Sequence, residues 1–190
     1  MKKLDSSLKN MMMVLVGVAF ISGGLLAWVN HITEKPITLQ QDKALADGIK
    51  AVMGAENVTV TGNDTVYKNV DNIKLAFILH LIGTQGTAVE SVVNGFGGPL
   101  RILVGFNTKG KILGYTILQT SETPGLGSKA STWFQKGGKG NIIGRQGGSL
   151  MVKKDGGDVD AITASTITSR AFLKAVNQAY QAIKNREGCK

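Results

Sequence analysis

The sequence is poor in the residues that build disulfides, metal clusters and hydrolytic triads. Cys189 is the only cysteine among 190 residues, so no intramolecular disulfide or thiolate cluster can form within the chain. The two histidines, His31 beside a long apolar segment and His80 inside an apolar run, are better explained by structural roles than by a metal site or a Ser-His-Asp triad. Any redox chemistry therefore requires a cofactor held in another way.

The positive charge lacks the clustering that nucleic-acid binding requires. The formal net charge is +9, but the lysines are scattered and form no compact Arg/Lys run with interleaved aromatic residues. We therefore expect no nucleic-acid partner. With 43% hydrophobic and 18% charged residues, a chain of this length supports one globular domain plus a targeting segment.

Charged residues are absent from Met11 to Val29. At about 1.5 Å per residue, a helix of this length spans roughly 28 Å, close to the hydrocarbon thickness of a bilayer. We predict a transmembrane helix over residues 11–29. A cleaved signal peptide is the competing interpretation, but its apolar region is normally about 7 to 15 residues long, and Leu25 stands where cleavage after Ala27 needs a small residue.

The charges that flank this segment predict its orientation. Three lysines precede it, opposed only by Asp5, and no comparable positive excess follows it (Lys2, Lys3 and Lys9). We expect a cytoplasmic N-terminus over residues 1–10 and an extracytoplasmic, periplasmic domain over residues 30–190.

The pattern of the remaining chain predicts an α+β fold with a central antiparallel-rich sheet and flanking helices. After Pro36, Thr38 and Gln41 have the spacing of a capping box, followed by a helical pattern to Met53. A second helical pattern covers residues 166–183. NTKG after Phe106 predicts a hairpin turn. The predicted strands are VTVTG, TVYKNV, LAFILHLIG, AVESVV, LRILVGF and KILGYTILQ.

Two segments could hold a ligand. In SETPGLGSK, Gly125, Gly127 and Ala130 spell G-x-G-x-x-A, but no βαβ pattern surrounds them, so we reject a dinucleotide fingerprint; the Pro/Gly turn instead offers backbone amides to an anionic or planar ligand. In the hydroxyl-rich stretch from Asp160 to Ser169, the predicted helix start suits a phosphate. The alternative explanations are an ordinary turn and simple N-capping by Thr163 or Ser165.

These two segments, with GFGGPL at residues 95–100 ahead of them, resemble a family of FMN-binding subunits. The family includes the G subunit of the Rnf ion-translocating electron-transport complex and the related C subunit of the sodium-pumping NADH:quinone reductase. The resemblance covers nearly the whole chain: the N-terminal anchor, the G-[FY]-G-G segment, the S-E-T-P-G-L-G loop and a D-x-x-[ST]-G-A-T-type motif occur in the family's order.

The resemblance implies that FMN is joined through its phosphate to the hydroxyl of Thr166 by a separate flavin transferase that uses FAD as donor. It also implies that residues of the SETPGLG loop lie against the flavin ring, with Lys129 as a further candidate to face an anionic oxygen (Glu122, Thr123, Gly125, Leu126 and Gly127). The chain departs from the motif at Ala164, where the family commonly has Gly, and at Ser165, where it commonly has Ala. Ser165 and Thr163 therefore stay alternative attachment points.

The function that this resemblance implies is electron transfer within an inner-membrane, ion-translocating oxidoreductase complex linked to ferredoxin and NAD. The chain would be a redox subunit with other membrane subunits as partners, and not a stand-alone enzyme; no catalytic base, nucleophile or metal is needed. Two alternatives stay open: an anchored flavoprotein that passes electrons to extracytoplasmic acceptors, and a non-redox binding or assembly module.

Overall fold

The computed structural model describes residues 8–54, 60–70, 73–82 and 86–187, and the chain divides into two units, Met1–Lys43 and Ala44–Lys190. Helix α1 runs from Leu8 to Met53 and contributes to both. Its N-terminal part is long and apolar enough to cross a membrane, and the side chains of that apolar window are not buried in the protein. This agrees with the transmembrane helix predicted over residues 11–29.

The predicted helix start at Thr38 is wrong. Pro36 lies inside α1, and the hydroxyl of Thr38 donates to the carbonyl of Lys35 at 2.8 Å instead of capping a new helix. A proline removes one intrahelical hydrogen bond, but helix propagation on both sides is cooperative, so one missing bond does not end the helix.

The second unit is built on a five-stranded antiparallel sheet in which each strand pairs with the next along the chain. The strands are β1 (Gly62–Val70), β2 (Ile73–Ile82), β3 (Gly86–Asn94), β4 (Pro99–Phe106) and β5 (Ile112–Thr120). Five of the six predicted strands are confirmed. The exception is VTVTG: Val60 and Thr61 precede β1, and its first two residues lie outside the described residues.

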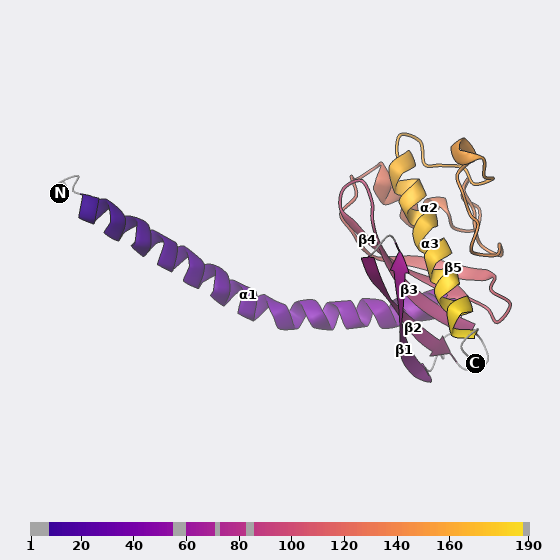
Figure 1. Cartoon of the computed structure of the whole chain (residues 1–190), viewed down its shortest axis with the longest axis horizontal. Coiled ribbons are helices and arrows are strands. Elements are labelled where there is room, and N and C mark those ends of the chain that lie inside the picture. The colour runs from indigo at the N-terminus through magenta and orange to yellow at the C-terminus, as the bar shows by residue number, and fades with distance from the viewer. Residues whose placement is uncertain (1–7, 55–59, 71–72, 83–85, 188–190) are drawn as a thin grey trace. The chain divides into compact units, whose positions relative to one another are not determined.

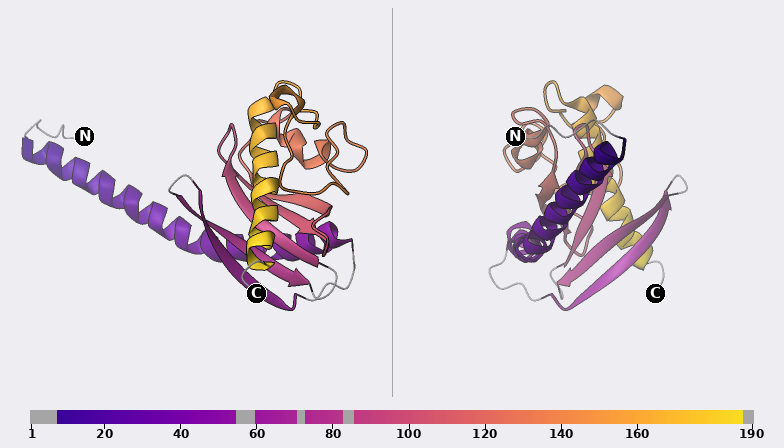
Figure 2. Two further views of the ribbon diagram at one scale, coloured as in Figure 1. Left: turned by 45° about the vertical axis from the view of Figure 1, so that its right-hand side comes forward. Right: turned by 90° about the vertical axis from the view of Figure 1, so that its left-hand side faces the viewer.

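Both faces of the sheet are covered. Helix α3 (Thr166–Glu187) lies along one face, where Phe172, Val176 and Ala179 pack on strand residues such as Val104 and Phe106 (Figures 1 and 2). The end of α1 packs on the other face, where its residues join a second buried cluster (Ile49 and Val52 with Ile82, Ala88 and Leu103). The predicted α+β class, antiparallel sheet and C-terminal helix are confirmed.

Two connections join the last strands and lead into α3. The predicted NTKG turn joins β4 to β5 as a hairpin, with the N–H of Asn107 donating to the carbonyl of Lys111 at 2.9 Å. The long connection from β5 to α3 carries three short helical turns, η1 (Gly127–Lys129), α2 (Ala130–Trp133) and η2 (Lys153–Asp155). This connection begins at the SETPGLG loop and ends just before Thr166, so it contains both predicted ligand segments.

Candidate functional site

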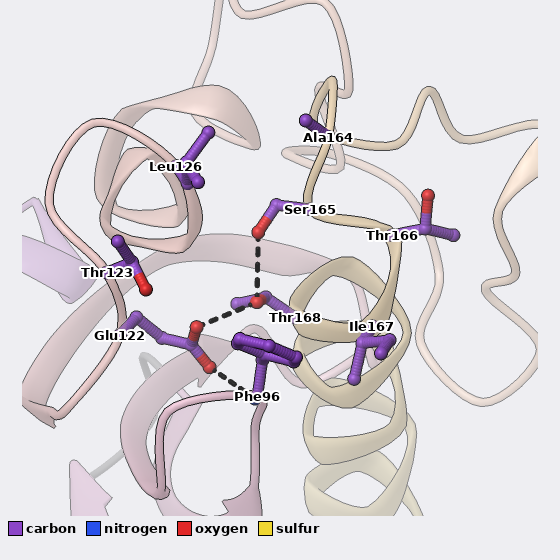
Figure 3. Close-up of a pocket in the computed structure, with 9 residues that line it drawn as sticks. All are labelled: Phe96, Glu122, Thr123, Leu126, Ala164, Ser165, Thr166, Ile167 and Thr168. Atoms are coloured by element: carbon purple, nitrogen blue, oxygen red, sulfur yellow. Dashed lines mark hydrogen bonds between the residues drawn. The ribbon is translucent and has the colours of Figure 1, made fainter.

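Three segments that are distant in the sequence meet around one cleft. They are the turn between β3 and β4, the loop after β5 and the turn that leads into α3 (Figure 3). The cleft has a volume of about 380 Å³. It is lined by Phe96, Glu122, Thr123, Leu126, Ala164, Ser165, Thr166, Ile167 and Thr168.

The carboxylate of Glu122 holds these three segments together. Its side chain is buried, and Oε1 accepts a hydrogen bond from the backbone N–H of Phe96 at 2.7 Å. Oε2 accepts a hydrogen bond from the hydroxyl of Thr168 at 2.9 Å. Each carboxylate oxygen thus reaches a different segment, and its donor is neutral.

Two glycines make room for this carboxylate. A Cβ added to Gly95 would lie 2.0 Å from Oε1 of Glu122, and one added to Gly127 would lie 2.3 Å from Oε2. Both distances are far below van der Waals contact, so any larger residue would displace the carboxylate. The same carboxylate therefore explains why glycine is required at Gly95 in GFGG and at Gly127 in SETPGLG.

The backbone N–H groups of the loop after β5 mostly donate to acceptors within the same loop. The N–H groups of Leu126 and Ser128 donate to the carbonyl of Thr123, and that of Gly125 donates to the hydroxyl of Ser128 at 2.9 Å. The N–H of Lys129 donates to the carbonyl of Leu126. The amides predicted to face an anion are therefore used, for these four residues, to build the turn.

Tyr115 fixes the short helix that follows this loop. Its hydroxyl donates to the carbonyl of Ala130 at 2.6 Å and accepts from the N–H of Phe134 at 3.2 Å. Burial raises the pKa of Tyr115 well above its ordinary value, against the opposing effect of the Phe134 N–H. The phenol therefore stays neutral and keeps its donor.

The turn before α3 is held by a serine from the first turn of that helix. The hydroxyl of Ser169 accepts from the N–H of Ile162 and donates to the carbonyl of Ser165, both at 2.9 Å. Within this turn Ala164 has φ +60°, the left-handed region that glycine adopts most readily. The left-handed conformation explains why the resemblance has Gly at this position. Ala164 adopts the same conformation with some backbone strain.

Thr166 is the first residue of α3, and its side chain is half-buried at the cleft. The first N–H groups of a helix have no intrahelical partner and carry a partial positive charge. In Figure 3 the hydroxyl of Thr166 points away from that of Ser165, which turns inward toward Thr168. A phosphoryl group on Thr166 would lie near these amides.

The structure brings six of the ten predicted site residues to the cleft, Glu122, Thr123, Leu126, Ala164, Ser165 and Thr166. The other four do not line it, Gly125, Gly127, Lys129 and Thr163. Sequence reasoning missed Phe96, Ile167 and Thr168. Thr168 had a usable signal, because it lies three residues after Ser165 at the predicted helix start, a spacing at which side chains can meet.

The cleft fits the FMN that the resemblance implies. Its rim carries the exposed apolar side chains of Phe96, Leu126 and Ile167, which suit one flat aromatic ring system. The polar side chains of Glu122, Ser165 and Thr168 are buried, and the volume falls within the range of about 300 to 1,000 Å³ that is usual for cofactor sites. The start of α3 would take the phosphate.

Comparisons with known proteins agree with this geometry. The sequence pattern of the FMN-binding domain matches residues 95–181, a range that contains all three segments of the cleft. The G subunit of the ion-translocating oxidoreductase complex of Shewanella oneidensis is 34% identical over 174 residues, which cover 85% of this chain and 82% of the relative. The chain belongs to the family of these G subunits. The G subunit of Shewanella piezotolerans is 33% identical over 94% of this chain and 89% of its own length. The G subunit of Vibrio vulnificus is 31% identical over 84% of this chain and 82% of its own length.

Membership in the G-subunit family extends well beyond the cleft. The match to the Shewanella piezotolerans protein covers nearly the whole chain, whereas the FMN-binding pattern is limited to residues 95–181. The residues before position 95 include the long apolar helix and the first three strands. The similarity to this relative therefore includes the sheet and most of the N-terminal helix as well as the cleft.

Proposed function

We propose that this chain is the FMN-carrying electron-transfer subunit of a membrane-bound, ion-translocating oxidoreductase complex. The observation that carries the proposal is the meeting of GFGG, SETPGLG and the start of α3 at one cleft, in a chain of the G-subunit family. When bound, FMN supplies the redox chemistry by accepting and passing on electrons one at a time. The protein supplies position, exclusion of water and the electrostatic surroundings.

We further propose that Thr166 carries the FMN through a phosphodiester bond made by a separate flavin transferase. The half-buried position of Thr166 at the start of α3 supports this assignment, because the remaining negative charge would lie beside the N–H groups at the N-terminus of that helix. Glu122 holds the loop after β5 against α3, and Phe96, Leu126 and Ile167 would shield the ring from water.

The topology is part of the proposal. Residues 1–10 would lie in the cytoplasm, residues 11–29 would cross the inner membrane once, and residues 30–190 would form the domain on the periplasmic side. The lysines ahead of the apolar stretch and its length support this arrangement. The remaining membrane subunits would be the partners, and redox-driven ion transport would be a property of the whole complex.

Replacing the acceptor residue tests the attachment. In cells that contain a flavin transferase, the full chain with Thr166→Val should lose all covalent flavin while its thermal unfolding stays close to that of the wild type, because a half-exposed hydroxyl contributes little to stability. Fluorescence of the denatured protein band measures the loss. Thr163→Val, which removes an exposed hydroxyl three residues earlier, is the matched control and should keep its flavin.

Purification from the native membrane tests the assignment to a complex. A tagged full chain should co-purify with several membrane-spanning subunits in a mild detergent. Recovery of the flavin-loaded chain alone under these conditions would support the anchored flavoprotein that serves extracytoplasmic acceptors. Recovery of a chain without any flavin would support the non-redox module.

A further inference from the structure

Two hydroxyl groups stand side by side at the proposed attachment point, and a transferase would have to distinguish them. Ser165 directly precedes Thr166, and both line the cleft. A serine hydroxyl is the less hindered of the two, so chemistry alone gives it no disadvantage. The two hydroxyl groups differ, however, in their hydrogen bonding and burial.

A hydrogen-bond chain with a fixed direction runs from Ser165 to Glu122. Thr168 donates its only hydroxyl proton to Oε2 of Glu122 at 2.9 Å. The hydroxyl oxygens of Ser165 and Thr168 are 3.1 Å apart. Because the proton of Thr168 is already committed, Ser165 must be the donor in this second bond. Its hydroxyl therefore points into the protein.

Burial strengthens the distinction. Ser165 is 9% exposed and Thr168 is completely buried, whereas the side chain of Thr166 is half-buried and its hydroxyl points away from the chain of hydrogen bonds (Figure 3). The direction of the chain is set at Glu122, since the second oxygen of that carboxylate is held by the N–H of Phe96. Glu122 thus acts on Ser165 through Thr168 without touching either reacting hydroxyl.

We propose that the Glu122–Thr168–Ser165 chain determines the site of flavin attachment by withholding the Ser165 hydroxyl, so that only Thr166 can react; this rests on the proposed function. In the reaction, the hydroxyl oxygen of Thr166 forms a bond to the FMN-side phosphorus of FAD. The pyrophosphate bond of FAD breaks, AMP leaves, and the hydroxyl proton passes to the transferase or to solvent. Glu122 and Thr168 are positioning residues.

The test uses the full chain, expressed with a flavin transferase, in a Thr166→Val background that removes the preferred acceptor. Covalent flavin on the peptide that contains Ser165 is then quantified by mass spectrometry. Thr166→Val alone should carry almost none. Adding Thr168→Val frees the Ser165 hydroxyl and should raise Ser165-linked flavin at least about tenfold, the factor that corresponds to roughly 1.4 kcal/mol. Adding Thr168→Ser keeps the hydroxyl and should leave the level low.

Glu122→Gln gives a second route that leaves no cavity. The amide oxygen can accept from Phe96, and the amide nitrogen then donates to Thr168, whose own proton turns toward Ser165. The direction of the hydrogen bonds reverses: Ser165 becomes the acceptor, and its hydroxyl proton is no longer donated to Thr168. Thr166→Val with Glu122→Gln should therefore also gain Ser165-linked flavin, and adding Ser165→Ala to either gaining variant should remove it.

The outcomes separate the two proposals. If the wild type carries no covalent flavin, the proposed function fails. If the wild type carries flavin on Thr166 but neither Thr168→Val nor Glu122→Gln raises Ser165-linked flavin in chains that still show cooperative thermal unfolding, the proposed function stands and the selection by Glu122 is overturned. The selection by Glu122 would also be overturned if Thr168→Ser raised Ser165-linked flavin as much as Thr168→Val.

Discussion

Two glutamates in the described part of the domain, Glu90 and Glu122, are buried in different ways. Glu90 lies within the sheet, where Oε1 is 3.0 Å from Nε2 of His80 and Oε2 accepts from Nε of Arg101 at 2.8 Å. Glu122 lies at the cleft, where its donors are a backbone amide and a hydroxyl. One carboxylate is compensated by a cation, and the other is satisfied by neutral groups beside a ligand-sized cavity. Glu90 therefore cross-links strands of the sheet, whereas Glu122 links the three segments that form the cleft.

The cluster around Glu90 joins four strands on the face opposite α3. Side-chain hydrogen bonds make this cluster. His80 on β2 is hydrogen-bonded to Asn63 on β1 and to Glu90 on β3, and Glu90 also accepts from Arg101 on β4. His80 and Glu90 are each 4% exposed and lie opposite Ala88 and Leu103, which belong to the apolar cluster under α1. The histidine that the sequence assigned to a structural role is thus buried and hydrogen-bonded inside the sheet.

Removing Glu90 should have the largest effect on stability. Glu90→Ala leaves a buried histidine and a partly exposed arginine without their shared acceptor, so we expect a loss of about 3 kcal/mol in the free energy of unfolding. Denaturant unfolding of the full chain in detergent measures it. Covalent flavin per folded molecule should not change. As a control, Asp158→Ala removes a mostly exposed carboxylate that pairs with Arg145 and should leave stability nearly unchanged.

Crowding the other carboxylate should instead affect the cleft. Gly127→Ala places a methyl group against Oε2 of Glu122, which should displace the carboxylate from Thr168, cost about 2 kcal/mol and lower flavin loading. Gly137→Ala is the matched control: its φ is +89° but open space surrounds it, so it should cost about 1 kcal/mol without changing the flavin. Equal flavin loading in the two variants would contradict the assigned role of Glu122.

The pH dependence of stability should report Glu90. Burial alone would raise the pKa of Glu90, but the hydrogen bonds from His80 and Arg101 and the charge of Arg101 outweigh it and hold the pKa below its ordinary value of 4.5. The folded pKa is the lower one, so the stabilisation is present above about pH 4.5 and is lost as the pH falls through the folded pKa. Melting temperatures between pH 3 and 7 should fall more steeply in the wild type than in Glu90→Gln.

The smallest effect should come from Ala164→Gly. Relief of the left-handed strain at φ +60° favours the variant by about 1 kcal/mol or slightly more, and the greater freedom of glycine in the unfolded chain removes much of that gain. We expect a net gain of about 0.5 kcal/mol and an unchanged position of the flavin. A loss of stability would show that the turn holds Ala164 by contacts that glycine cannot make.

The sequence predicted those parts of the molecule that depend on local patterns. Alternation located five strands, and helical spacing located α3 with Thr166 at its start. The contacts of Glu122 were out of reach, because they join residues 26 and 46 positions apart, and such pairings follow from topology. The same limit hid the place of Phe96 in the cleft, whereas the spacing of Thr168 from Ser165 was a local signal that the prediction did not use. The capping-box spacing of Thr38 and Gln41 misled the prediction, because these residues lie inside one continuous helix.

The most direct test of flavin attachment at Thr166 is the intact mass and fluorescence of the denatured wild-type chain from cells that contain a flavin transferase. We predict a mass larger than that of the polypeptide by one FMN less a water molecule, yellow fluorescence that survives denaturation, and the modification on the peptide that begins α3 at Thr166. The mass of the bare polypeptide, with no fluorescence after denaturation, would contradict this prediction.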